Sequence, residues 1–232
     1  MLRRGTAGVL LLLLALICGC SASPDTRGPL PDASSLVTAA AAQVDQVRAF
    51  RFDVSVSGMI PGLDIREVKG QAARDGGPYG SATGQADMQE SLNRFELTFA
   101  ITGDKLRLTN AKGVQTEQPV PAQYNPVALL DPAKGLPNLL RSTTDLKTET
   151  KEDVKGVETY RVTGELARDA VTGLVPAIQS DVDVKFWVTQ AEPRTLVRVW
   201  IQVPPRQPNE GAVMLEFALS PPSTSTGPTP AG

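Results

Sequence analysis

Apolar and polar residues alternate along most of this 232-residue chain. An alternation with a period of two indicates a strand with one buried and one solvated face. Five segments show it clearly, and their apolar members are Phe52, Val54 and Val56; Phe95, Leu97, Phe99 and Ile101; Val182, Val184, Phe186 and Val188; Val197, Val199, Ile201 and Val203; and Val213, Leu215, Phe217 and Leu219. We predict further strands over residues 63–73, 81–88, 105–109, 145–152 and 157–166, between turn sequences. The chain therefore contains about ten half-buried antiparallel strands.

One long helix and two shorter helical segments accompany the strands. Residues 32–49 repeat apolar side chains at helical spacing, and Pro31 with Asp32 supplies a start signal. Shorter helical segments are predicted within 126–142 and 168–178. This inventory predicts an α+β domain, a highly curved antiparallel half-barrel with helices on its concave face, because every strand offers one apolar face to a common interior.

The pattern leaves open whether this interior is a solid core or an apolar cavity that holds a ligand. A solid core is the ordinary interpretation of each single apolar residue. The run Ala39-Ala40-Ala41-Ala42 favours a cavity, because small side chains opposite a broad sheet leave space at the usual packing density of a protein interior.

The N-terminus has the layout of an export signal. Arg3 and Arg4 precede an apolar run over residues 9–17, which is too short to span a membrane. Ile17-Cys18-Gly19-Cys20 resembles the bacterial lipobox, so we expect cleavage before Cys20 and attachment of fatty acids such as palmitate to it. An ordinary signal peptide followed by a chance cysteine is the alternative, and it is disfavoured because no second cysteine remains to pair with Cys20.

These features divide the chain into four parts. We expect a lipoprotein signal peptide over 1–19, a flexible tether over 20–30, a single domain over 31–220 and a disordered tail over 221–232. The protein is then exported and held by its lipid on the outer face of the cell membrane.

The composition excludes several kinds of chemistry. The chain has no histidine, which removes imidazole-based catalytic triads and most catalytic zinc sites. The glycine-rich segment 76–80 is expected to be a turn rather than a phosphate loop, and Glu152 with Asp153 are expected at a solvated strand end. Acidic and basic residues are interspersed at a net charge of −2, so nucleic acid is not an expected partner. We expect no catalytic residue, metal or cofactor, and binding becomes the default function.

Trp187 and Trp200 are out of phase with the apolar faces of their strands, so each should project to the opposite side. Packing under a helix or an edge loop is favoured over a contact with membrane or sugar, because nothing in the sequence clusters the two rings.

The domain resembles the LppX/LprA/LprF/LprG family of mycobacterial and actinobacterial lipoproteins, and the LprG-like members most. The segments that carry the resemblance are Gly28-Pro29-Leu30-Pro31-Asp32, Ile60-Pro61-Gly62-Leu63, Ala82-Thr83-Gly84, residues 129–136 with Leu139-Leu140, and Gly156-Val157-Glu158-Thr159 with Arg161-Val162-Thr163-Gly164.

The resemblance implies a half-barrel around an apolar cavity that takes the acyl chains of lipids. The implied ligands are triacylated glycolipids of the lipoarabinomannan and phosphatidylinositol mannoside type, or triacylglycerol, carried through the periplasm to the outer cell envelope beside an efflux pump of the major facilitator class. The protein is expected to be a monomer. The candidate lipid-contacting residues are Phe52, Val54, Val56, Ala82, Ala86, Met88, Phe95, Leu97, Phe99, Val182, Val184 and Phe186. The alternative function is a surface-exposed structural or adhesion lipoprotein with a solid core.

Overall fold

The computed structural model describes residues 24–205, 207 and 209–222. The expected signal peptide, the expected lipid attachment site Cys20 and the tail from residue 223 onward lie outside the described residues. No helix in the part of the chain that the structure describes is long and apolar enough to cross a membrane.

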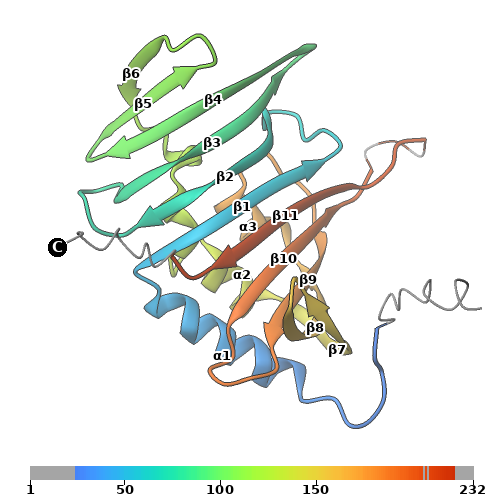
Figure 1. Ribbon diagram of the computed structural model, residues 1–232. Coiled ribbons are helices and arrows are strands. Elements are labelled where there is room, and N and C mark those ends of the chain that lie inside the picture. Colours follow the sequence, from blue (N-terminus) through green and yellow to red (C-terminus); the bar gives the residue numbers. More distant parts are fainter. Residues whose placement is uncertain (1–23, 206, 208, 223–232) are drawn as a thin grey trace, which may run out of the picture.

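Within the described residues, eleven strands form one antiparallel sheet (Figure 1). They are β1 Ala49–Ser57, β2 Ile65–Ala73, β3 Ser81–Glu90, β4 Asn93–Thr102, β5 Lys105–Asn110, β6 Gln115–Pro119, β7 Thr144–Val154, β8 Val157–Leu166, β9 Val182–Thr189, β10 Leu196–Val203 and β11 Val213–Ser220. Their order is β6-β5-β4-β3-β2-β1-β11-β10-β9-β8-β7, so the first and last strands pair at the centre. The sheet is open, and β6 and β7 form its two edges.

The helices gather on one face of the sheet, which Figure 1 shows from the opposite side. They are α1 Ala33–Gln46, the 3-10 helices η1 Ala122–Tyr124 and η2 Pro126–Leu130, α2 Leu136–Ser142 and α3 Arg168–Leu174. Asp32 caps α1 by accepting a 2.8 Å hydrogen bond from the backbone N–H of Ser35, which confirms the predicted helix start. We call this side of the sheet the helix face and the other the outer face.

The core lies between the helix face and the helices. Leu36, Val37 and Val44 of α1 pack with strand residues such as Val184 and Phe186. Small side chains such as those of the alanine run do not dominate this region, because the segment after β6 adds four buried leucines, Leu130, Leu136, Leu139 and Leu140. Of the four consecutive alanines, Ala40 and Ala41 are buried and Ala42 is exposed.

Most predicted elements are confirmed, and four differ. The helix predicted over 32–49 ends at Gln46, because Ala49 already pairs with Ala73 in the sheet. The helical segment predicted over 126–142 is broken at 131–135, where the Asp131 carboxylate accepts the backbone N–H of Ala133 at 2.7 Å. Strand β6 was not predicted. Its five residues are all exposed, so they carry no apolar period.

The fourth difference is a change of phase within β10. A β-bulge lies between Leu196 and Arg198, so Leu196 joins the core in place of Val197. The prediction that Val197 shares the buried face of Val199 and Ile201 is therefore wrong. An extra residue of this kind leaves the apolar period of the following residues intact, and the sequence alone does not reveal it.

Candidate functional site

The helix face of β1–β4 carries apolar side chains that line up from strand to strand. In one row Val54 pairs with Val68, Val68 with Ala86 and Ala86 with Leu97. In the next row out, Met88 pairs with Phe95. Antiparallel neighbours in register stand on the same side of a sheet, so these residues form one surface. We call Val54, Val68, Ala86, Met88, Phe95, Leu97 and Phe99 the apolar strip.

The apolar strip lies partly outside the packed core. Val54, Val68 and Phe99 are half-buried against core residues, whereas Met88, Leu97 and Phe95 extend beyond the core cluster. Phe95 is 43% exposed. Phe95 adjoins Met88 and Leu97 on the same face, and contiguous exposed apolar side chains, rather than single ones, mark contact sites. The strip is therefore an apolar surface that the helices leave partly open.

Two glycines let aromatic rings lie against the sheet beside the apolar strip. Gly70 pairs with Phe52, and Gly84 pairs with both Gly70 and Phe99. A Cβ atom at Gly70 would lie 3.1 Å from Cζ of Phe52, and one at Gly84 would lie 2.7 Å from Cζ of Phe99. Side chains at these two positions would push the rings off the sheet. Glycines within neighbouring strands are the sequence signal for such close ring packing, and apolar alternation alone does not reveal it.

The twelve candidate lipid-contacting residues fall into two groups. Phe52, Val56, Ala82, Val182, Val184 and Phe186 are buried in the packed core with the helices. Val54, Ala86, Met88, Phe95, Leu97 and Phe99 lie in the apolar strip. Their contact with lipid stays a prediction. In the second group Phe95 is exposed and Met88 and Leu97 are half-buried, so these three are the most accessible to a ligand.

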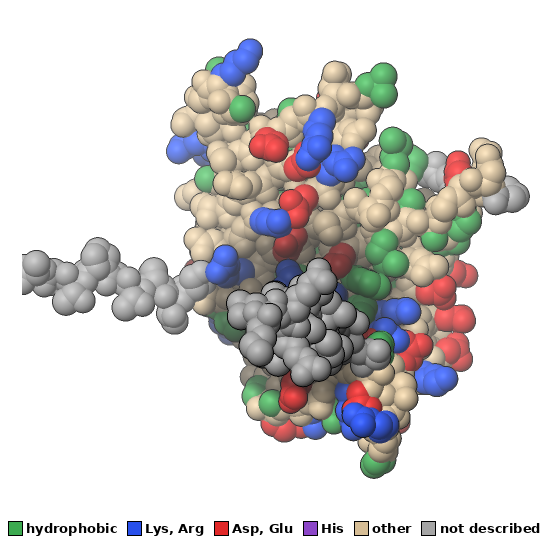
Figure 2. Space-filling model, turned by 45° about the vertical axis from the view of Figure 1, so that its right-hand side comes forward, with side chains coloured by type: hydrophobic (Ala, Val, Ile, Leu, Met, Phe, Trp, Pro, Cys, Tyr) green, Lys and Arg blue, Asp and Glu red, His purple; other side chains and the backbone are tan. Residues whose placement is uncertain are grey.

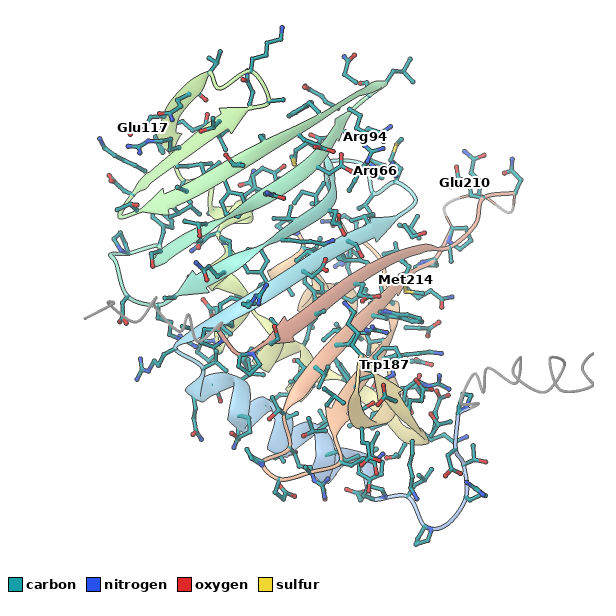
Figure 3. All side chains as sticks on the ribbon, viewed as in Figure 1. Arg66, Arg94, Glu117, Trp187, Glu210 and Met214 are labelled. Carbon is teal, nitrogen blue, oxygen red and sulfur yellow. The ribbon has the colours of Figure 1, made fainter. Side chains whose placement is uncertain are left out.

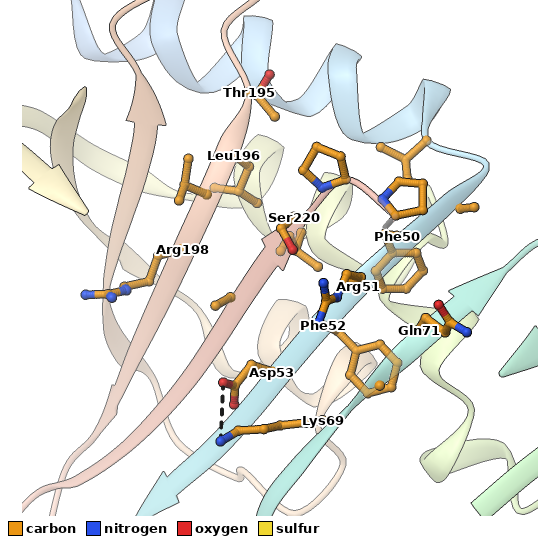
Figure 4. A pocket seen from close by; sticks show the side chains of 18 of the residues that line it. Phe50, Arg51, Phe52, Asp53, Lys69, Gln71, Thr195, Leu196, Arg198 and Ser220 are labelled. Atoms are coloured by element: carbon orange, nitrogen blue, oxygen red, sulfur yellow. Dashed lines mark ion pairs between the residues drawn. The ribbon is translucent and has the colours of Figure 1, made fainter. Parts of the chain in front are cut away.

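A cleft of about 1070 Å³ reaches the outer face (Figure 4), and its lining is mainly apolar, because it includes Leu196, Phe50 and the candidate lipid-contacting residue Phe52. Arg51, Asp53 and Lys69 lie on its floor, and Lys69 approaches Asp53 to 3.9 Å between Nζ and Oδ2. Burial raises the pKa of Asp53 despite that cation, whereas the hydrogen bond with Glu67 raises the pKa of Lys69. Lys69 is therefore a protonated ion-pair partner at neutral pH and a poor nucleophile.

Acidic and basic side chains are interspersed on this side of the molecule (Figure 2). Lys105 repeats the arrangement of Lys69, because its hydrogen bond with Glu117 raises its pKa. Among the described residues, no group of three His, Cys, Asp or Glu side chains is placed to hold a metal ion. The outer face thus shows paired charges rather than an assembled catalytic centre.

The outer face also carries a cluster that the sequence did not suggest. The rings of Trp187 and Trp200 meet edge to face at 4.9 Å between centroids, and Cζ of Arg198 lies 5.5 Å from the centroid of Trp187. The indole of Trp187 donates to Glu152 at 2.8 Å, and that of Trp200 donates to Glu216 at 2.5 Å. We call Trp187, Trp200, Arg198, Glu152 and Glu216 the tryptophan cluster.

The tryptophan cluster corrects two expectations. The rings do project opposite to the core, but they pack on each other and on Arg198 rather than under a helix or loop. Glu152 does not end a solvated strand, because it binds both Trp187 and Arg161, the latter at 2.5 Å. Asp153 is exposed as expected, and its carboxylate accepts the backbone N–H of Gly156 in the hairpin turn. Cross-strand neighbours supply every member of the cluster, so no local sequence pattern reveals it.

Comparison with known proteins places this fold and sequence among lipoproteins. The family model of the LppX_LprAFG lipoprotein matches residues 32–218. The lipoarabinomannan carrier protein LprG of Mycobacterium tuberculosis is 30% identical over 189 residues, covering 81% of this chain and 74% of that protein. The protein of the same name from Mycolicibacterium smegmatis is 28% identical over 203 residues, covering 85% of each chain.

Two solved structures share the fold. LprF from Mycobacterium bovis superposes with a TM-score of 0.70 at 19% identity, covering 89% of this chain and 100% of that one. Lipoprotein LppX from Mycobacterium tuberculosis superposes with a TM-score of 0.60 at 17% identity, covering 81% of this chain and 92% of that one.

Proposed function

We propose that this chain, which belongs to the LppX_LprAFG lipoprotein family, is a lipid-anchored carrier that binds the acyl chains of lipids on its helix face. The observation that carries the proposal is the apolar strip, whose outer members Met88, Leu97 and Phe95 continue the core surface beyond the helices. Acyl chains laid along this strip cover the exposed apolar area, and the polar headgroup stays in water.

The ligand that we propose is an acylated glycolipid. Relatives that match most of this chain are named lipoarabinomannan carriers, which supports triacylated lipoarabinomannan or its phosphatidylinositol mannoside precursors as cargo. Triacylglycerol presents the same acyl chains and is the alternative cargo. The proposed route runs from the outer face of the cell membrane to the outer envelope, with a major facilitator efflux pump as the membrane partner.

Burial of acyl chains gives enough free energy without a catalytic group. Each methylene moved from water into an apolar environment contributes about 0.8 kcal/mol, so about ten buried methylenes contribute roughly 8 kcal/mol. Ordering the chain and the protein offsets part of this gain. The non-directional nature of the interaction suits a carrier, because it must also release its cargo.

One observation favours the second candidate, a structural or adhesion lipoprotein. The helix-covered half of the sheet is packed. Helix α1 lies against β9 and β10, and α2, with buried Leu136, Leu139 and Leu140, packs on α1. If this alternative holds, a protein partner covers the apolar strip instead of a lipid.

Replacing Leu97 tests the carrier function, and the same strand supplies a matched control. Leu97→Asp places a carboxylate in the apolar strip and should weaken binding of a fluorescent triacylated lipid about tenfold or more, because an unpaired charge is costly in an acyl environment. Thr98→Asp places the same charge on the outer face of β4, where Thr98 is exposed, and should leave binding unchanged. Equal loss in both variants, or in neither, would contradict the assignment of the strip.

Replacing Cys20 tests the anchor. Cys20→Ala should release the protein from membrane fractions and abolish its labelling by radioactive fatty acid, because the lipobox-like sequence ends at this residue. The circular dichroism spectrum should keep the strand signal of the folded domain. A Cys20→Ala protein that still incorporates fatty acid would show that the lipid is attached elsewhere.

A further inference from the structure

Large exposed apolar side chains gather at one end of the strands, where turns connect neighbouring strands of the sheet. Met59 is 66% exposed, Leu92 97%, Phe95 43% and Val114 56%. Met59, Leu92 and Val114 belong to the turns β1–β2, β3–β4 and β5–β6, and Phe95 lies near the start of β4. The three turns lie at the same end of the strands because the strands are antiparallel and in register. Among the described residues the fifth large exposed apolar side chain is Val157, 39% exposed, which begins β8 at the opposite end of the strands. We call the three turns together with Phe95 the apolar edge.

The apolar edge is continuous with the apolar strip. Phe95 belongs to both, and it pairs with Met88 of the strip. At the β1–β2 turn, Ile60 is buried and joins the core, and it pairs with half-buried Leu63 beneath exposed Met59. An acyl chain that enters at this edge therefore meets apolar side chains without interruption from the tips to the core.

Electrostatic attraction does not explain a contact at this edge. The tips over 58–64, 90–94 and 111–114 carry two acidic residues, Asp64 and Glu90, and two basic residues, Arg94 and Lys112. Arg66 and Arg94 lie side by side (Figure 3), and both pair with Asp87, Arg94 at 2.7 Å and Arg66 at 3.8 Å. Separate apolar tips without net charge suit a fluid lipid surface, into which each tip inserts independently.

An anchor at Cys20, as proposed above, would hold the domain close to the membrane. Pro24 is four residues after Cys20, so the backbone between them spans at most about 14 Å. The next residue, Asp25, is fixed to β7 by two backbone hydrogen bonds with Lys151, of 2.9 and 2.8 Å, so the tether joins the sheet nearer to Val157 than to the three turns of the apolar edge. The described chain begins on the right-hand side of the molecule, and the turns of the apolar edge lie along its top and upper right (Figure 1).

We infer that the apolar edge inserts into the surface of the membrane that holds the anchor, and that it aligns the apolar strip with the acyl chains of that leaflet. The edge is thus a bilayer contact site and the end at which cargo enters and leaves. The role in cargo exchange rests on the proposed carrier function, whereas the bilayer contact can be measured separately.

A fluorescent label on the anchored protein tests this contact. Cleavage before Cys20 removes Cys18, and acylation blocks Cys20, so Leu92→Cys introduces the one reactive thiol of the processed chain. The acylated full-length protein is labelled there with a nitrobenzoxadiazole dye and reconstituted in phosphatidylcholine vesicles. The dye should brighten severalfold, shift its emission to shorter wavelength and be quenched by nitroxide-labelled lipid. A dye at Met59→Cys should behave in the same way.

Val157→Cys is the matched control, because it places the dye at an exposed apolar residue at the opposite end of the strands. Val157 also lines the cleft, so its dye is compared with and without vesicles: its emission should not change, and nitroxide-labelled lipid should not quench it. Equal emission from dyes at positions 92 and 157 would overturn the inference. Lipid bound to the same preparation is measured by mass spectrometry. If the protein carries lipid but the dyes stay in water, the bilayer contact is refuted and the carrier function stands. If the dyes enter the bilayer but the protein carries no lipid, the contact stands and the carrier function is refuted.

Discussion

Trp187→Ala is expected to lower the free energy of unfolding by about 3–5 kcal/mol and to leave the bound acyl lipid unchanged. The side chain is 2% exposed although it lies on the outer face, because Trp200 and Arg198 cover it. Its removal leaves a cavity and deprives the half-buried carboxylate of Glu152 of its indole donor. Urea unfolding followed by circular dichroism measures the stability.

Trp187→Phe separates the two contributions. It keeps an aromatic ring against Arg198 but removes the donor to Glu152, so its loss of stability should lie between those of the native protein and Trp187→Ala. Lipid content is determined on the same preparations. A Trp187→Ala protein with native stability would show that the tryptophan cluster is not structural, and loss of lipid at native stability would give the outer face a part in binding.

Ala86→Trp is expected to remove most of the bound lipid while the melting temperature changes little. Ala86 is buried in the apolar strip between Val68 and Leu97, both of which are half-buried. An indole at this position occupies the space over the strip that we assign to acyl chains. In a solid core the same substitution costs about 1–3 kcal/mol through overpacking, so the two functions predict different results.

Melting temperature and bound lipid are measured on one preparation of Ala86→Trp. Gln85→Trp serves as the control, because Gln85 is exposed on the outer face of the same strand. A strongly destabilised Ala86→Trp protein with the native amount of lipid would refute the assignment of this strand to the ligand.

The alternation of apolar residues predicted most of the sheet because each strand has one buried face. Val157–Leu166 appears in the structure with the predicted bounds, and Asp32 starts the long helix as its capping chemistry requires. Strand β6 cannot be predicted from apolar alternation, because its five residues are all exposed and an edge strand of this kind has no buried apolar face. The bulge beside Val197 cannot be predicted from the sequence either, because it depends on how β10 pairs with β9.

The candidate site was predicted in part. The phase of β3 and β4 placed Ala86, Met88 and Leu97 on the helix face, where the structure has them. The same reasoning could not separate them from Val184 and Phe186, which have equal hydrophobicity but lie under the helices. That distinction depends on where the segment after β6 packs, a tertiary contact with no local signal. The apolar edge likewise depends on which turns the topology brings together.

The lipid content of the native protein tests the carrier function most directly. The protein is purified from membranes, denatured and extracted with organic solvent, and the extract is analysed by mass spectrometry; the covalently attached anchor stays with the protein. A lipid carrier should yield an acylated lipid in stoichiometric amount. Folded native protein without any extractable acyl lipid, which also fails to take up triacylated lipid from vesicles, would contradict it.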